Sequence, residues 1–200
     1  MSENNKNKKD VREKPSFLKG ERLDLRPPDA DFKDLYFKWM NIPEARTFAH
    51  NVFPLTKEQI NKWFEPREDE SPEFISFDMW HKEDKKPIGF VGFNHINWVN
   101  RNANIFIRIG EVDYWRKGYA TEAAKMVIDY GFLELNFHKI YAGVHSRNIA
   151  SWTVAEEKIG FVKEAVLKDE VYVSGEYLDA YKYRLLRSEW EKLREKAKKH

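Results

Sequence analysis

The most informative segment of this chain reads Asp113-Tyr114-Trp115-Arg116-Lys117-Gly118-Tyr119-Ala120-Thr121-Glu122-Ala123-Ala124-Lys125. It follows residues 103–109, where isoleucine occupies every second position from 105 to 109, as expected for a half-buried strand. Beyond Thr121 the apolar residues recur at helical spacing. The segment is therefore predicted to be a turn through Gly118 that joins a strand to a helix.

A turn of this kind gathers unpaired backbone N–H groups and the positive end of a helix dipole around one concavity. Phosphate groups bind at such concavities. The spacing differs from the G-x-x-x-x-G-K-[ST] loop of nucleotide hydrolases and from the G-x-G-x-x-G loop of dinucleotide folds. Gly118 and Ala120 fit close approach of a ligand to the backbone. An ordinary tight turn is the alternative explanation.

The loop resembles the pyrophosphate loop of the GCN5-related N-acetyltransferase (GNAT) superfamily, whose pattern is [Q/R]-x-x-G-x-[G/A]. Here the pattern reads Trp115-Arg116-Lys117-Gly118-Tyr119-Ala120. Tryptophan at the first position departs from the superfamily pattern and is similar to the Rim-type branch, in which W-x-K-G-Y-x-T-E-A is usual. Other segments resemble the family in the same order: Gly20–Pro27, Phe137–Val144, Asn148–Ser151 and Glu157–Phe161. The resemblance covers about residues 17–190.

The periodicities predict an α/β fold with a mixed, mostly antiparallel central sheet and helices on both faces. Helices are expected after Asp29, after the capping box that begins at Thr56, after Gly118 and from Ser151 to Lys158. The last two strands should form a hairpin around Ser174-Gly175. The predicted strands span residues 22–26, 74–80, 87–95, 103–109, 139–144, 162–166 and 177–186.

The chain divides into three predicted parts. Residues 1–15 should be a flexible charged tail, because they carry too little apolar surface to offset the entropy of ordering. Residues 16–190 should form the acetyltransferase domain, and residues 191–200 a charged C-terminal helix end or tail.

Composition removes several classes of function. The 200 residues are 42% hydrophobic, enough for one core of ordinary size, and include no cysteine for disulfides or thiolate chemistry. A formal net charge of +2 gives little support for nucleic-acid binding, for which only Lys6–Lys9 and Lys192–Lys199 are candidates. No apolar run is long enough for a membrane span. We expect a cytoplasmic protein without nucleic-acid or membrane partners.

The resemblance implies acetyl-CoA as cosubstrate, and no residue spacing suggests a metal site. It implies that the backbone of Ile107, Arg108 and Ile109 pairs with the pantetheine arm. It also implies that Asn148 contacts the cofactor, although this residue would serve equally well as a helix cap. The loop that would hold the pyrophosphate consists of Trp115, Arg116, Lys117, Gly118, Tyr119, Ala120 and Thr121.

Direct attack of an amine on a thioester requires a base that takes a proton from the amine. The candidates are His95, Glu111 and Asp113. His95 ends a strand beside the expected cofactor strand, and the two carboxylates directly precede the loop. Where family members carry an acidic residue in the cofactor strand, this chain has Asn104. Each candidate has a purely structural alternative.

The departing thiolate needs a proton, which many family members supply from a tyrosine. This chain has Ala155 and Glu156 at that place, and the segment from Asn148 to Gly160 is one residue longer than the family pattern. Ser151 is the substitute that the resemblance favours, because Rim-type relatives carry a serine there. A serine at the start of a helix is also a common cap.

The sequence thus predicts an N-acetyltransferase that moves the acetyl group of acetyl-CoA to a primary amine. The amine of a protein N-terminus, a polyamine, and an amino sugar or other amino metabolite are the open choices of acceptor. The alternative is a non-catalytic CoA-binding or regulatory module that has lost its acid. A homodimer is compatible with the sequence but is not determined by it.

Overall fold

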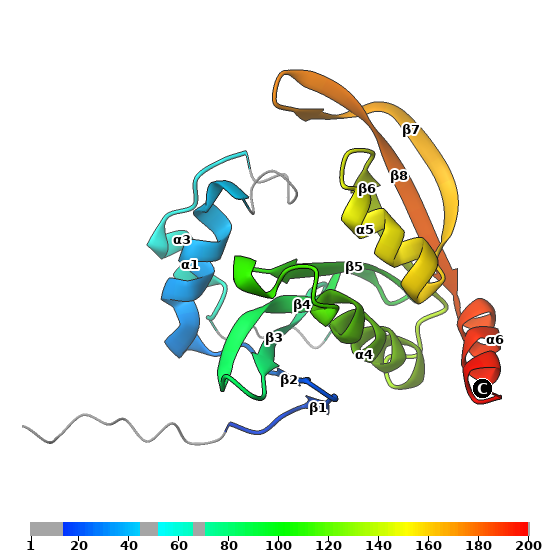
Figure 1. Cartoon of the computed structure of the whole chain (residues 1–200), viewed down its shortest axis with the longest axis horizontal. Helices are drawn as coiled ribbons and strands as arrows, with labels where there is room; N and C mark the ends of the chain where they lie inside the picture. Colours follow the sequence, from blue (N-terminus) through cyan, green and yellow to red (C-terminus); the bar gives the residue numbers. More distant parts are fainter. Residues whose placement is uncertain (1–13, 45–51, 66–70, 200) are drawn as a thin grey trace, which may run out of the picture.

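In a computed structural model, residues 14–44, 52–65 and 71–199 are described, so nearly all of the expected N-terminal tail lies outside the described residues. The described residues form an eight-stranded sheet in the order β1-β2-β3-β4-β5-β6-β8-β7 (Figure 1). The strands are β1 Leu18–Lys19, β2 Leu23–Arg26, β3 Ile75–His81, β4 Lys86–Asn97, β5 Asn102–Ile109, β6 Lys139–His145, β7 Val162–Val173 and β8 Glu176–Leu186.

Every neighbouring pair of strands is antiparallel except β5 and β6, which run parallel. This confirms the predicted mixed, mostly antiparallel sheet. The helical elements are the short 3-10 turn η1 Ala30–Phe32, α1 Lys33–Asn41, α3 Lys57–Lys62, the 3-10 turn η2 Val112–Tyr114, α4 Tyr119–Leu133, α5 Ile149–Thr153, the π-helix η3 Val154–Ile159 and α6 Arg187–Ala197.

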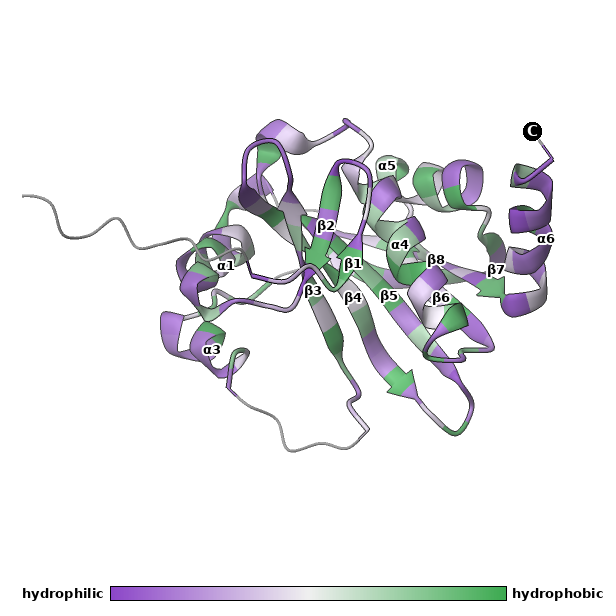
Figure 2. Ribbon diagram, turned by 90° about the horizontal axis from the view of Figure 1, so that it is seen from below, coloured by the Kyte–Doolittle hydropathy of each residue, from purple (hydrophilic) through white to green (hydrophobic). Residues whose placement is uncertain are grey.

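Helices cover both faces of the sheet, as predicted. Successive side chains of a strand point to opposite faces, and on β4 Phe90 packs with α1 and α3, whereas Val91 and Phe93 belong to the core that contains α4. In Figure 1, α1 and α3 stand on one side of the central strands and α4 on the other. Figure 2 shows hydrophobic residues concentrated on the central strands and α4, while α6 is largely hydrophilic.

The expected caps and turns are present. Asp29 accepts a hydrogen bond from the Asp31 backbone N–H at 2.9 Å and caps the turn that leads into α1. Thr56 forms the predicted capping box at the start of α3. Ser174 and Gly175 have φ angles of 51° and 92°, which is the left-handed pair that a two-residue hairpin requires.

Two boundaries differ from the sequence prediction. β7 continues to Val173 instead of ending near Val166, and its pairing with β8 has an irregularity in register between Leu167 and Val171. The strand pattern was missed here because the residues after Leu167 are mostly polar. α6 crosses residue 190, where Trp190 packs on Phe132 with ring centroids 5.0 Å apart. The charged residues from 191 onward therefore form the outer part of α6, whose first turn packs on α4 through Trp190. No helix within the described ranges has the length and apolarity needed to cross a membrane.

A buried polar contact attaches α1 to the sheet. The Tyr36 hydroxyl on α1 donates to the Asp78 carboxylate on β3, and both side chains are buried. Asp78 also accepts from the Asp29 backbone N–H at 3.0 Å. Burial raises the pKa of Asp78 to about 7, against the opposing effect of these donated hydrogen bonds.

We expect Asp78→Asn to reduce the dependence of stability on pH. Because the folded chain holds this proton more tightly than the unfolded chain, the stabilisation is complete below about pH 4 and is lost as the pH rises through about 7. Over that window the wild type should lose on the order of 3 kcal/mol of unfolding free energy from this group. Urea unfolding at a series of pH values measures the difference between the two proteins.

Asp34→Asn is the matched control, because Asp34 is an exposed carboxylate on α1, the helix that carries Tyr36. Its unfolding free energy should follow the wild-type pH dependence. Parallel pH curves for Asp78→Asn and the wild type would show that Asp78 does not titrate in this range.

Candidate functional site

The central feature of the site is a gap in strand pairing between β5 and β6. The two strands pair only where Asn102–Asn104 face Lys139–Tyr141. β5 nevertheless continues to Ile109 in pairing with β4, and β6 continues to His145 in pairing with β8. Beyond Asn104, the edge of β5 that faces β6 thus has no partner strand among the residues that the structure describes. Backbone groups on such an edge can pair with an extended ligand.

Ile107, Arg108 and Ile109 all lie on this open part of β5. The two isoleucine side chains pack against the core that contains α4. The Arg108 side chain lies on the opposite face, with its guanidinium 5.8 Å from the centre of the Phe90 ring. Burial lowers the pKa of Arg108 to about 10, so this side chain is still charged at neutral pH. This arrangement is compatible with the prediction that the backbone of these three residues pairs with the pantetheine arm of the cosubstrate.

Trp115, which replaces the usual Gln or Arg of the loop pattern, closes the turn after β5. Its indole Nε1 donates to the Ile109 carbonyl at 2.9 Å. One acceptor position of that carbonyl is therefore already used. The freely available part of the β5 edge lies before Ile109.

The predicted loop has the expected conformation around Gly118. Gly118 has φ 84° and caps α4, and Arg116 is also left-handed with φ 59°. The first backbone hydrogen bond of the helix runs from Glu122 N to Gly118 O at 3.1 Å. The amides of Tyr119, Ala120 and Thr121 consequently have no acceptor within the helix, and they form its positive end.

A groove of about 570 Å³ opens at this end of α4. Cationic side chains outnumber acidic ones among its lining residues, which are Glu21, Arg22, Arg116, Gly118, Thr121, Glu122, Lys125, Val154 and Lys158. Of the two basic loop residues, Arg116 lines the groove. The Lys117 ammonium instead lies 5.7 Å from the centre of the Tyr114 ring. Such a groove suits a ligand that carries several phosphate charges.

Asn148 and Ser151 lie together at the start of α5. The Asn148 side chain is buried, and its Oδ1 accepts from the Ser151 backbone N–H at 3.2 Å, so Asn148 is the helix cap. Ser151 is exposed, and its hydroxyl has no hydrogen-bond partner in the described part of the chain. The helix cap is therefore Asn148, and not Ser151.

The extra residue between Asn148 and Gly160 is absorbed by a π-helix. α5 passes directly into η3, where the Gly160 N–H bonds to the Ala155 carbonyl five residues earlier, at 3.0 Å. A π turn holds one more residue than an α turn. The register after the insertion is thereby restored.

Neither residue at the usual tyrosine position offers a proton. Ala155 is buried and has no polar side-chain atom. Glu156 accepts from the Tyr183 hydroxyl at 2.8 Å and forms an ion pair with Lys163 at 3.2 Å. These two contacts, the first of them the stronger, hold the pKa of Glu156 below its usual value. Its carboxylate is therefore ionised at neutral pH.

The candidate bases differ in how firmly they are held. Glu111 accepts from the Trp39 indole at 2.7 Å and from Lys38 at 3.0 Å. Partial burial alone would raise the pKa of Glu111, but these donors lower it below its usual value. Glu111 thus connects α1 to the loop, while Asp113 is exposed.

His95 lies in an irregularity of β4, with φ 50° and an exposed side chain. Its neighbour Asn94 pairs with Asn104, the last β5 residue that also pairs with β6. The backbone of His95 therefore lies next to the closed end of the gap. Asn104, which replaces an acidic family residue, donates to the Asn94 side chain at 2.7 Å.

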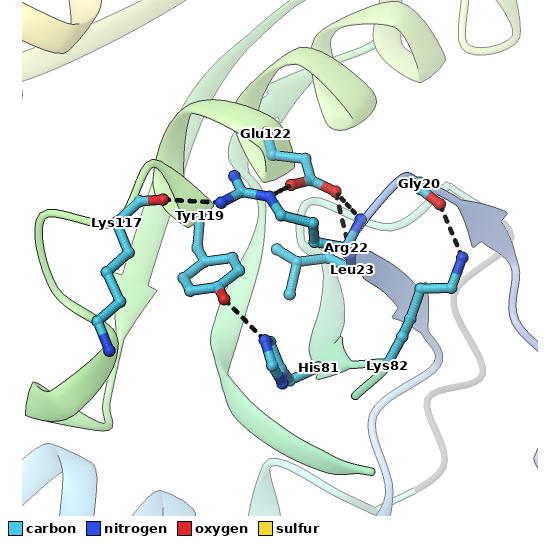
Figure 3. Close-up of polar contacts among 8 residues, drawn as sticks. All are labelled: Gly20, Arg22, Leu23, His81, Lys82, Lys117, Tyr119 and Glu122. Carbon is cyan, nitrogen blue, oxygen red and sulfur yellow. Dashed lines mark hydrogen bonds and ion pairs between the residues drawn. The ribbon is translucent and has the colours of Figure 1, made fainter. Parts of the chain in front are cut away.

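Two further residues of the groove were not singled out from sequence. The Arg22 Nη1 donates to the Lys117 carbonyl at 2.8 Å, and its Nε donates to Glu122 at 2.8 Å (Figure 3). Glu122 belongs to the motif, but Arg22 is separated from the loop by nearly the whole first half of the chain. No local pattern connects the two.

Known proteins share this arrangement. A family model described as an acetyltransferase (GNAT) domain matches residues 22–162. An uncharacterized N-acetyltransferase, p20, from Bacillus licheniformis is 33% identical over 173 residues, which is 85% of this chain and 96% of the relative. A spermidine N(1)-acetyltransferase from Escherichia coli is 38% identical over 97 residues, which is 48% of this chain and 51% of the relative.

Among solved structures, a spermidine N-acetyltransferase from Vibrio cholerae in complex with CoA and spermine superposes with a TM-score of 0.77. It is 25% identical and covers 85% of this chain and 98% of its own. The family match spans well over half of the chain and includes the open edge of β5 and the Gly118 loop. The chain therefore belongs to the GNAT acetyltransferase family and is an N-acetyltransferase that uses acetyl-CoA.

Proposed function

We propose that this enzyme transfers the acetyl group of acetyl-CoA directly to a primary amine of a polyamine, and that it belongs to the Rim-type branch. The observation that carries the direct transfer is that the chain presents an unpaired β5 edge and, at the Gly118 loop that follows this strand, a cationic groove. An extended pantetheine and a charged pyrophosphate need these two surfaces in this order. The tryptophan-containing loop pattern supports the branch.

The choice of a polyamine among the three acceptor classes is supported by the relatives. Proteins named for spermidine acetylation share both sequence and fold with this chain. Thiol release from acetyl-CoA in the presence of spermidine, an N-terminal peptide or an amino sugar tests the choice. Turnover should be fastest with spermidine. A strong preference for the peptide or the sugar would refute the polyamine assignment without affecting the transfer chemistry.

In this proposal the amides of Tyr119, Ala120 and Thr121 hold the pyrophosphate, with Arg116 contributing charge. The backbone of Ile107 and Arg108 pairs with the pantetheine amides, which directs the thioester toward the closed end of the gap. A backbone N–H of β5 on the open edge would stabilise the oxyanion that forms at the thioester carbon. Asn148 contributes by fixing the start of α5 beside this path.

Proton transfers complete the reaction. We assign the base to His95, because Glu111 is occupied by Trp39 and Lys38 and because His95 follows Asn94 at the closed end of the gap, whereas Asp113 belongs to the loop end. His95 would take one proton from the ammonium form of the acceptor, directly or through water. After attack the nitrogen must lose a second proton to become an amide. Ser151 is the group proposed to protonate the departing thiolate and to regain its proton from that nitrogen, since its hydroxyl has no other partner among the described residues.

Gly118→Val should weaken CoA binding by roughly tenfold or more, because lost amide contacts to a charged group cost about 1.5–3 kcal/mol. A branched side chain is strained at φ 84°, and its Cβ would stand 3.3 Å from the Arg22 Nη2. Titration calorimetry with CoA measures the loss.

Gly175→Val is the matched control, because Gly175 has φ 92° and open space around it in the β7–β8 turn. It should carry a similar backbone strain and leave CoA affinity unchanged. A folded Gly118→Val protein with wild-type affinity would refute the assignment of the loop.

Ser151→Ala should lower kcat by roughly ten- to a hundredfold, the lower part of the range for lost acid-base assistance. The affinity for CoA should change little, because the backbone N–H that Asn148 caps is retained. Steady-state kinetics with a saturating amine separates the two constants. Thr153→Ala, on the same helix, is the control and should keep the wild-type kcat.

The opposite pattern would contradict this role. If KM for acetyl-CoA rises in Ser151→Ala while kcat holds, Ser151 binds the cosubstrate and another group supplies the proton.

A further inference from the structure

The loop before α4 holds a backbone conformation that its own sequence does not favour. Arg116 is a non-glycine residue with φ 59°, and Gly118 follows two positions later with φ 84°. Left-handed backbone is uncommon at a non-glycine residue, although six other described residues adopt it. In this loop, contacts from another part of the chain hold the segment that follows Arg116.

Those contacts come from the turn between β1 and β2. The Arg22 guanidinium donates through Nη1 to the Lys117 carbonyl at 2.8 Å and through Nε to the Glu122 Oε2 at 2.8 Å. The Glu122 Oε1 accepts in return from the backbone N–H groups of Arg22 and Leu23, at 2.7 and 3.0 Å. Figure 3 shows the guanidinium between the loop carbonyl and the helix carboxylate.

The turn that carries Arg22 is itself firmly placed. Leu23 is fully buried in the main core, and Gly20 N–H bonds to the Leu23 carbonyl at 2.9 Å. A Cβ on Gly20 would stand 2.6 Å from that carbonyl and 3.1 Å from the Glu122 Oε1, so the close approach depends on glycine. The sheet thus provides a fixed point from which Arg22 reaches the loop.

Glu122 would otherwise be an unfavourable neighbour for a phosphate. Its carboxylate belongs to the first turn of α4, and this end of the helix lines the groove through Gly118 and Thr121. The ion pair with Arg22 neutralises this charge and turns it toward the β1–β2 turn. The remaining nitrogen of Arg22, Nη2, lies 3.3 Å from the position of a Cβ on Gly118, and Arg22 lines the groove.

We propose that Arg22 and Glu122 are positioning residues for acetyl-CoA: together they hold the Lys117–Gly118 segment in its anion-binding conformation, and Nη2 of Arg22 faces the phosphate path. This inference rests on the proposed function of the loop. Glu122 acts only through Arg22 and the backbone. Both residues affect the binding of the cosubstrate and not the proton transfers, which belong to the opposite end of the β5 edge.

The test compares four single variants of the full chain by CoA calorimetry, steady-state kinetics and thermal unfolding. Arg22→Gln should weaken CoA binding and raise KM for acetyl-CoA by roughly tenfold, as expected for losing charge-assisted hydrogen bonds. Its kcat and its KM for the amine should stay within about twofold, because transition-state interactions are untouched. Glu122→Gln should give the same pattern, because the Glu122 carboxylate holds Arg22 and the β1–β2 turn in place.

Arg22→Lys is the conservative variant, and it keeps the charge but cannot reach both acceptors as a planar guanidinium does. It should recover only part of the lost affinity. Lys82→Gln is the matched control. Lys82 also contacts the β1–β2 turn, because it donates to the Gly20 carbonyl at 3.0 Å, but it does not line the groove. Its CoA affinity should equal that of the wild type.

The double variant Arg22→Gln with Glu122→Gln should bind CoA about as weakly as either single variant, because the two residues act as one unit. Wild-type affinity in Arg22→Gln, together with a clear loss in Gly118→Val, would overturn the positioning role and leave the loop assignment intact. A kcat loss with unchanged CoA affinity would also overturn it. If Arg22→Gln does not fold, full CoA affinity in Arg22→Lys and Glu122→Gln would overturn it equally.

Discussion

Peptide groups in a sheet need hydrogen-bond partners, and this fold leaves one strand edge in its interior without them. β5 and β6 separate after Asn104 and Tyr141, while β4 and β8 continue to hold them from outside. Because β5 stays paired with β4 and β6 stays paired with β8, the gap does not disrupt the sheet. The Gly118 loop and α4 follow this edge in the chain, and the proposed binding of an extended, amide-rich cosubstrate depends on it.

The two ends of the edge have different chemistry. At the loop end, free helix amides and a cationic groove form the surface that we propose binds the charged part of the cosubstrate. At the closed end, Asn104 is neutral and bonded to Asn94, so the family's acidic residue is replaced by a group that cannot take a proton. Glu111 and Glu156 are held as ionised acceptors. In the proposed mechanism the proton transfers are therefore assigned to His95 and Ser151, whose side chains have no such contacts among the described residues.

Local chemistry made much of this predictable from sequence. The Gly118 loop, the Asp29 and Thr56 caps and the Ser174-Gly175 turn depend on a few adjacent residues, and the structure confirms them. The Arg22–Glu122 contact joins residues a hundred positions apart, and only the sheet brings them together. The sequence showed that the segment from Asn148 to Gly160 is one residue longer than the family pattern. It did not show that a π-helix at Val154–Ile159 accommodates the extra residue. The outer half of β7 was missed because charged residues on an exposed hairpin conceal strand periodicity.

The central claim is that the cosubstrate pairs with the open edge of β5 and ends at the α4 amides. Amide hydrogen exchange of the wild type, with and without CoA, tests it most directly because it reports backbone protection residue by residue. The account predicts slower exchange on binding at 105–109 and at Tyr119–Thr121, with no change in the outer β7–β8 hairpin. Saturating CoA that leaves exchange on β5 and at the start of α4 unchanged would contradict it.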